Sequence, residues 1–327
     1  MSDPLPGAVV RSGKDPTSIA DAMIRLRAQR LVAVPTETVY GLAARTLDEA
    51  AIQQVYQVKG RPNDNPLIAH VSSIEMARSL VSEWPEQADR LASVLWPGPL
   101  TMVLPRADSV PAVSTGGRDS IAIRIPAHSV ALEVIHRLGE PISAPSANRS
   151  GSLSPTEARH VLSEFVDHDL LVLDGGPCRV GLESTVVDLR GPHPVVLRPG
   201  VVTADRLSAV LGVEVAASEV SGQADSPGTA SSHYAPATAT RLCTAEEAGG
   251  DEVAVVLVGG GMDAKLGNAG RFLVSLPADP EIAGSLLYST LHAADLSGSR
   301  RIDVVPPPAT PAWAAIHDRL QRAAAPR

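Results

Sequence analysis

Two cations stand close together in the segment KGRPNDNPLIAH, which covers residues 59–70. Lys59 offers a point charge and Arg61 offers a planar fork of N–H donors, and both suit phosphate groups. Pro62 and Pro66 restrain the chain around them. The pair can equally be a solvated basic pair, with residues 63–65 acting as turn formers. The spacing alone therefore leaves both phosphate binding and a surface turn open.

A third cation, Arg124, is set in the apolar segment SIAIRIP, residues 120–126. A charged side chain among apolar positions needs an anionic partner when it is buried. The carboxylate of a ligand can supply that partner, and so can an internal Asp or Glu.

Further polar side chains lie in loops next to expected strands. They are Thr36, Glu37 and Thr38 in VPTETVYGLAA, His70 after an apolar run, Ser146 and Asn148 in APSAN, and Glu183, Ser184 and Thr185 in GLESTVV. Each has a structural alternative, namely the cap of a following turn, a packed histidine, a Ser/Asn turn or the start of a strand. Ligands of open α/β sheets bind at strand ends, so the shared location points to one site.

Several common sites are absent from the sequence. No GxxxxGK[ST] segment occurs, which excludes a Walker-type phosphate loop, and the GGG at 259–261 lacks the rest of a dinucleotide fingerprint. Cys178 and Cys243 are the only cysteines and form no CxxC pair. The sequence thus predicts neither a cysteine zinc site nor a disulfide framework, which fits the reducing cytoplasm.

The elements that would position these loops alternate between helices and strands. Asp48 is expected to cap one helix, and Thr17 or Ser18 an earlier one. Expected strands are 31–35, 66–71, 100–104, 120–125, 142–143, 170–173, 184–189, 194–198, 253–258, 271–276 and 301–305, and further helices are 85–96, 128–138, 155–165, 280–296 and 310–325. Aromatic residues are only 3% of the chain, so the core must be aliphatic, as in buried parallel strands. The prediction is an α/β fold.

Length and composition predict two domains. The 327 residues exceed a typical single domain, and residues 214–240 are rich in Ser, Ala, Gly and Pro without a sustained period. We expect a flexible start at 1–15, a large domain at 16–212, a linker at 213–240 and a small α/β domain at 241–327.

Charge and hydropathy exclude other classes of protein. The net charge of −8 disfavours a protein whose main task is gripping a nucleic-acid backbone. The first residues lack the apolar core of a signal peptide, and no run of about 18 apolar residues predicts a membrane span.

Taken together, the loop segments resemble the YrdC-type threonylcarbamoyl-AMP synthase family over roughly residues 17–200. KGRP and APSAN are its paired signature, and SPGTASSHYAP at 226–236 resembles the linker of the longer, two-domain members. The resemblance implies a YrdC-like twisted mixed sheet with flanking helices, followed by a small Rossmann-like domain. The lead-in VVPPPATP at 304–311 departs from the family in being rich in proline.

The resemblance also implies a reaction. L-threonine, bicarbonate or CO2, and ATP with Mg²⁺ give threonylcarbamoyl-AMP and pyrophosphate, and a separate transferase then modifies tRNA. The implied L-threonine ligands are Thr38, His70, Arg124, Ala144 and Ser184. The implied ATP ligands are Lys59, Arg61, Asn65, Ser120, Ser146, Asn148, Ser154, Arg198 and Tyr234. Lys59 and Arg61 would stabilise charge during catalysis, no side chain would ligate a metal, and the linker would either close over the site or act as a plain tether.

Two other functions remain open at this stage. An RNA-binding module is one, which the acidic composition disfavours. The other is a carbamoyl-adenylate enzyme of the hydrogenase-maturation type, although nothing in the chain resembles the acylphosphatase and zinc-finger-like segments of those proteins.

Overall fold

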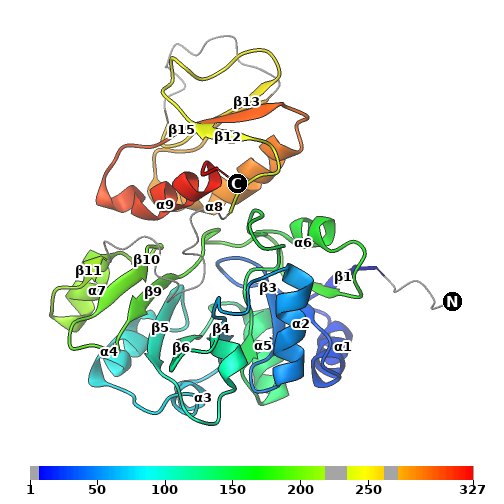
Figure 1. The fold of residues 1–327 in the computed structure, drawn as a ribbon, viewed down its shortest axis with the longest axis vertical. Coiled ribbons are helices and arrows are strands. Elements are labelled where there is room, and N and C mark those ends of the chain that lie inside the picture. The colour runs from blue at the N-terminus through cyan, green and yellow to red at the C-terminus, as the bar shows by residue number, and fades with distance from the viewer. Residues whose placement is uncertain (1–6, 218–233, 261–271, 327) are drawn as a thin grey trace.

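The computed structural model describes residues 7–217, 234–260 and 272–326. Figure 1 shows a large domain, which contains the N-terminal half of the chain, and a small domain stacked on it. The α/β class and the mixed sheet predicted from the sequence are confirmed. Among the described helices, none is long and apolar enough to cross a membrane.

One mixed sheet forms the centre of the large domain, in the order β1-β8-β2-β3-β7-β4-β6-β5-β9-β10-β11. Its strands are β1 (Val9–Ser12), β2 (Val32–Val34), β3 (Gly41–Arg45), β4 (Ile68–His70), β5 (Leu100–Pro105), β6 (Ser120–Arg124), β7 (Ile142–Ser143), β8 (Leu171–Asp174), β9 (Thr185–Asp188), β10 (Val195–Arg198) and β11 (Ala216–Ala217). The flanking helices are α1 (Pro16–Arg27), α2 (Glu49–Lys59), α3 (Ile74–Arg78), α4 (Glu86–Leu95), α5 (Ser129–Leu138), α6 (Ala158–Glu164) and α7 (Ala204–Leu211), with a 3-10 turn at Ala112–Thr115.

The helix that leads into the KGRP loop begins and ends as its sequence dictates. The Asp48 side chain accepts a hydrogen bond from Ala51 N at 3.1 Å, which confirms it as the N-cap of α2. Gly60 ends the helix with φ of 62°, a left-handed conformation that glycine adopts without strain. The chain therefore reverses directly after Lys59 and carries Arg61 back toward the sheet.

Three sequence predictions were wrong in detail. Asp15, rather than Thr17 or Ser18, caps α1, because its carboxylate accepts hydrogen bonds from both of their backbone N–H groups. Strand β1 lies in the segment expected to be flexible; its four side chains are exposed, and it pairs with β8 through the backbone. Strand β3 was taken for part of a loop.

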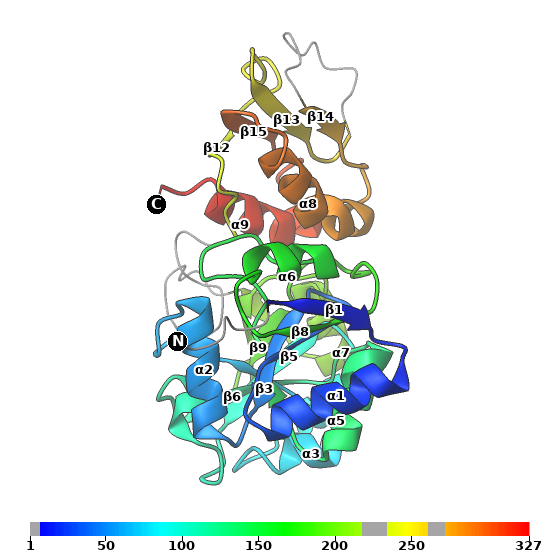
Figure 2. The same cartoon turned by 90° about the vertical axis from the view of Figure 1, so that its right-hand side faces the viewer.

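The small domain is built on a wholly parallel sheet in the order β12-β15-β13-β14. Its elements are β12 (Thr240–Leu242), β13 (Val253–Leu257), β14 (Phe272–Ser275), β15 (Arg301–Val305), α8 (Pro280–Asp295), a 3-10 turn at Pro311–Trp313, and α9 (Ala314–Ala323). In Figures 1 and 2, α8 and α9 lie between this sheet and the large domain. The two helices therefore form the domain interface.

The interface contains an apolar core to which both domains contribute. Val39, Leu153 and Leu182 of the large domain belong to one buried cluster with the small-domain residues Leu287 and Ile316. The small domain is consequently docked by burial of apolar surface and not tethered by the linker alone.

Candidate functional site

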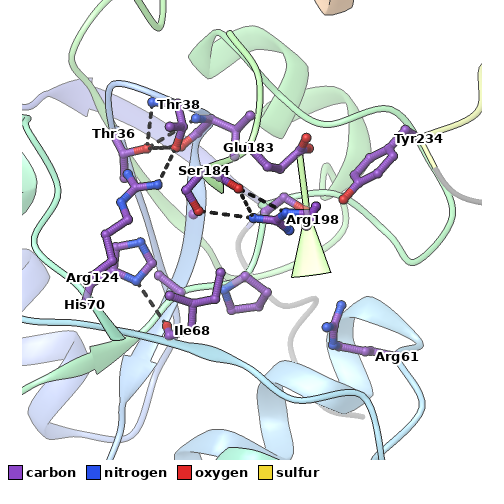
Figure 3. A pocket seen from close by; sticks show the side chains of 15 residues that line it. Thr36, Thr38, Arg61, Ile68, His70, Arg124, Glu183, Ser184, Arg198 and Tyr234 are labelled. Atoms are coloured by element: carbon purple, nitrogen blue, oxygen red, sulfur yellow. Dashed lines mark hydrogen bonds between the residues drawn. The ribbon is translucent and has the colours of Figure 1, made fainter. Parts of the chain in front are cut away.

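A cavity gathers the strand-end loops of the large domain. Strands β4 and β6 are parallel neighbours that place His70 and Arg124 at the same register position, so both side chains reach the same end of the sheet. The lining residues are Thr36, Thr38, Val39, Gly41, Arg61, Ile68, His70, Arg124, Ala144, Pro145, Ser146, Glu183, Ser184, Arg198 and Tyr234. Figure 3 shows Arg124, His70 and Thr38 on one side, and Arg61, Arg198 and Tyr234 on the other.

The cavity brings together most of the residues that the sequence singled out. All five residues of the expected L-threonine set line it, as do Arg61, Ser146, Arg198 and Tyr234 of the ATP set. Lys59, Asn65, Ser120, Asn148 and Ser154 do not line it. Tyr234 belongs to the predicted linker, whose residues 218–233 lie outside the described part of the chain.

The anionic partner of Arg124, which the sequence left open, is Glu37. Its Nη2 donates to Glu37 Oε2 at 2.9 Å and its Nη1 donates to Thr38 Oγ1 at 2.9 Å, and the Arg124 and Glu37 side chains are both almost fully buried. Burial lowers the pKa of Arg124, and Glu37 opposes that shift. Arg124 Nε and Glu37 Oε1 are buried without a hydrogen-bond partner among the described residues, so the pair retains capacity for a polar ligand.

The TET segment forms a compact turn at the edge of the cavity. Thr36 Oγ1 accepts hydrogen bonds from Thr38 N and Val39 N at 3.2 Å and donates to Val39 O at 2.6 Å. The turn predicted as a structural alternative is therefore present, and it also fixes Thr38 against Arg124.

His70 is neutral in this environment. Burial, reinforced by the neighbouring Arg124, lowers its pKa to about 3. Its Nδ1 lies 3.1 Å from Ile68 O, and this contact is a hydrogen bond only if Nδ1 carries the proton. Nε2 is then an acceptor.

Arg198 and Ser184 form a second polar group in the cavity wall, with Ser184 between Arg124 and Arg198 in Figure 3. Arg198 donates from Nε and Nη2 to Ser184 O, and from Nη2 to Ser184 Oγ at 3.1 Å. The Ser184 hydroxyl also lies 2.7 Å from Thr101 Oγ1, a contact that the sequence did not suggest. The hydroxyl of Ser184 is thus held in a fixed position.

Arg61 is positioned by the loop that follows it. Its Nη2 donates to Asn65 Oδ1 at 2.5 Å and to Pro66 O at 2.9 Å, and its Nε donates to Asn65 O at 3.1 Å. Burial lowers its pKa to about 10, which leaves the guanidinium charged at neutral pH. Asn65 therefore supports Arg61 from outside the cavity.

Lys59 has a different place from the one expected. Its Nζ donates to Ser146 O at 2.5 Å and to Asn148 O, and burial together with Arg61 lowers its pKa well below the ordinary value. Because the ammonium is buried under the APSAN loop, Lys59 shapes that loop and does not face the cavity. Lys59 is not among the residues that line the cavity, and its expected role in stabilising charge during catalysis stays a prediction.

The remaining residues of the expected ATP set lie in the loops and strands around the cavity. Asn148 Nδ2 donates to Arg149 O and Ser152 O, and Ser154 Oγ donates to Glu183 Oε1 at 2.5 Å. Ser120 begins β6 opposite Pro105 of β5.

The small domain contributes contacts that the sequence did not reveal. Glu183, in the cavity wall, accepts hydrogen bonds from Arg319 Nε at 2.7 Å and from Tyr288 Oη at 3.0 Å. These partners are more than 100 residues away in the chain, and an arginine in an amphipathic helix normally indicates a solvent-facing position.

Comparison with known families agrees with this geometry. A family model described as telomere recombination, covering Sua5, YciO and YrdC proteins, matches residues 25–200. A second model, described as the C-terminal domain of threonylcarbamoyl-AMP synthase, matches residues 202–325. The chain belongs to the threonylcarbamoyl-AMP synthase family.

Individual members of the threonylcarbamoyl-AMP synthase family are similar in sequence over about two thirds of the chain and in structure over nearly all of it. The enzyme of Pyrococcus abyssi is 48% identical over 215 residues, which cover 64% of this chain and 63% of that protein, slightly less than two thirds. The Bacillus subtilis enzyme is 42% identical over 71% of this chain and 68% of its own. A structure of P. abyssi Sua5 complexed with L-threonine superposes with a TM-score of 0.84 at 36% identity, covering 97% of this chain and 96% of that one.

Proposed function

We propose that this chain makes L-threonylcarbamoyl-AMP and pyrophosphate from L-threonine, bicarbonate or CO2, and ATP. The observation that carries the proposal is a single cavity with three buried arginines, Arg61, Arg124 and Arg198. Cations on both sides suit two anionic substrates, a carboxylate and a triphosphate. The relationship to threonylcarbamoyl-AMP synthases supports the same substrates.

The Arg124 side suits L-threonine. The guanidinium, already fixed by Glu37 and Thr38, would pair with the threonine carboxylate, and the neutral His70 would orient the amine by accepting a hydrogen bond at Nε2. The proposed L-threonine ligands are Thr38, His70, Arg124, Ala144 and Ser184.

The Arg61 side suits ATP. Arg61 and Arg198 would offset phosphate charge, and the proposed ATP ligands in the cavity are Arg61, Ser146, Arg198 and Tyr234. Lys59, Asn65, Ser120, Asn148 and Ser154 would support them from the frame. Mg²⁺ would arrive on the phosphates, because the carboxylate of Glu183 already accepts hydrogen bonds from three side chains.

The proposed reaction needs no covalent enzyme intermediate. The neutral threonine amine adds to CO2 and loses one proton to water to give a carbamate. A carbamate oxygen then attacks the α-phosphorus of ATP, and the bond to pyrophosphate breaks as pyrophosphate leaves. Positioning and charge neutralisation dominate such phosphoryl chemistry, which matches a cavity rich in fixed donors. The product would pass in the cytoplasm to a separate tRNA threonylcarbamoyl transferase, so that tRNA is met indirectly.

The test is pyrophosphate release measured with each substrate omitted in turn, together with mass detection of threonylcarbamoyl-AMP. Release that is independent of L-threonine would contradict the proposal. Arg61→Ala should weaken ATP binding and Arg124→Ala should weaken L-threonine binding, each by about 10- to 100-fold, since charge-assisted hydrogen bonds contribute about 1.5–3 kcal/mol. Arg137→Ala, at an exposed ion pair with Glu133, is the matched control.

A further inference from the structure

Tyr234 occupies a strained and buried position in the cavity wall. It is 1% exposed, and its backbone φ is 60°, in the left-handed region that tyrosine rarely adopts. Such a conformation costs on the order of tenfold in equilibrium terms and persists only where surrounding contacts over-determine it. Contacts around Tyr234 must therefore hold this conformation.

The contacts on the ring come from the small domain. The guanidinium carbon of Arg319, on α9, lies 5.4 Å from the centre of the Tyr234 ring. The Tyr288 ring, on α8, has its centre 5.9 Å away on a tilted plane. A cation over an aromatic face and a tilted aromatic pair are both favourable, so the two helices fix the ring in place.

The same two side chains hold the carboxylate of Glu183. Tyr288 Oη lies within hydrogen-bond distance of both Glu183 oxygens, and Arg319 Nε donates to Oε2. Burial alone would raise the pKa of Glu183, but Arg319, Arg198 and the hydrogen bonds outweigh it and keep that pKa below its ordinary value. Glu183 thus remains ionised in the cavity wall beside Ser184.

A further acid fixes the plane of the Arg319 fork. Arg319 Nη1 donates to Asp318 Oδ2 at 2.5 Å, and Arg322 donates to Asp318 Oδ1 at 3.0 and 2.8 Å. The guanidinium, 1% exposed, is therefore held by two carboxylates through different nitrogens while its carbon lies over the Tyr234 ring. A Lys side chain could not contact Glu183, Asp318 and the Tyr234 ring at the same time.

We propose that Arg319 is a positioning residue for ATP binding, acting from the small domain by fixing the Tyr234 ring and the Glu183 carboxylate in the cavity wall. The inference rests on the proposed function, because it assigns Tyr234 to the nucleotide. In Figure 3, Glu183, Tyr234 and Arg198 lie together, away from Arg124 and His70. The effect of Arg319 should therefore fall on ATP and spare L-threonine.

The experiment is calorimetric titration of the full chain with ATP and, separately, with L-threonine. In Arg319→Gln, the Kd for ATP should rise about tenfold or more, from loss of the cation over the ring and of a charge-assisted hydrogen bond, with the Kd for L-threonine within about twofold. Arg300→Gln is the matched control, since Arg300 lies in the same domain in an exposed pair with Glu252. Unchanged ATP affinity in Arg319→Gln, or equal weakening of both ligands, overturns the proposal.

Arg319→Lys decides the matter if Arg319→Gln does not fold. The lysine ammonium still balances the charge of Glu183, so the variant should fold, but it lacks the planar set of N–H donors of arginine. Its Kd for ATP should therefore rise about fivefold, with L-threonine binding unchanged. ATP affinity within twofold of the parent would overturn the proposal. Failure of the parent chain to bind ATP or L-threonine would instead overturn the proposed function, so the two failures are distinguishable.

Discussion

Replacing Glu37 by Gln would test the charge pairing that underlies the L-threonine side of the cavity. The substitution keeps the shape of the side chain and removes its charge. Glu37 Oε2 accepts hydrogen bonds from Arg124 Nη2 at 2.9 Å and from Ala127 N at 3.0 Å. The Gln oxygen can accept both bonds, but the buried guanidinium loses its anion.

The two hydrogen bonds to Glu37 Oε2 determine how much unfolding free energy Glu37→Gln should lose. Each bond to a charged oxygen contributes about 1.5–3 kcal/mol, and each bond to a neutral oxygen about 0.5–1.5 kcal/mol. The difference for two bonds is roughly 2–3 kcal/mol of lost unfolding free energy. This is below the roughly 3–5 kcal/mol expected when one partner of a buried pair is removed completely, because the Gln oxygen still accepts both bonds.

Urea denaturation followed by tryptophan fluorescence measures the loss. Glu133→Gln, at an exposed pair with Arg137, is the control and should change the unfolding free energy by less than about 0.5 kcal/mol. Saturating L-threonine should stabilise Glu37→Gln more than the parent, because the substrate carboxylate replaces the missing anion. The reasoning fails if Glu37→Gln is as stable as the parent, or if L-threonine stabilises the two equally.

Two further predictions concern the domain interface. A Cβ at Gly181 would lie 2.5 Å from Ser285 O, so Gly181→Ala should lower the melting temperature. Gly176→Ala is the control, because Gly176 has a similar left-handed φ but its Cβ would meet nothing within 4 Å, and it should lower the melting temperature less. Equal losses in the two variants would count against close docking of the domains. His160 and His292 stack across the interface at 3.9 Å, and burial, followed by His292, lowers the pKa of His160 to about 3. Their contribution to stability is therefore complete above pH about 6.5 and is lost as the pH falls toward 3. His292→Gln should flatten the fall of melting temperature with pH in that window, and an unchanged slope would refute the assignment.

Much of the fold could be predicted because hydrophobic periodicity reports burial against local neighbours. The segments of β5, β6 and α5 were predicted to within two residues. Strand β3 was missed because the TET turn precedes it and its Gly41, Ala43 and Ala44 carry a weak strand signal. Strand β1 was missed because its four residues are exposed and its apolar run is only two residues long, Val9 and Val10.

The site was predictable where residues cluster along the chain and not where they meet only in space. KGRP and APSAN are local patterns, and their loops do meet in the structure. The sequence could state that Arg124 needs an anion but could not choose Glu37 from many carboxylates. The pairing of Glu183 with Arg319 depends on how α9 docks, which no local pattern encodes.

The shared apolar cluster at the interface has a practical consequence for dividing the protein. A fragment ending near residue 212 would expose Val39, Leu153 and Leu182 to water and would leave Glu183 without its ion-pair partner Arg319. Exposed apolar surface of this kind promotes aggregation. The domain boundary that the sequence suggests therefore marks a change in composition, and in this chain expression and folding have to keep the two domains together.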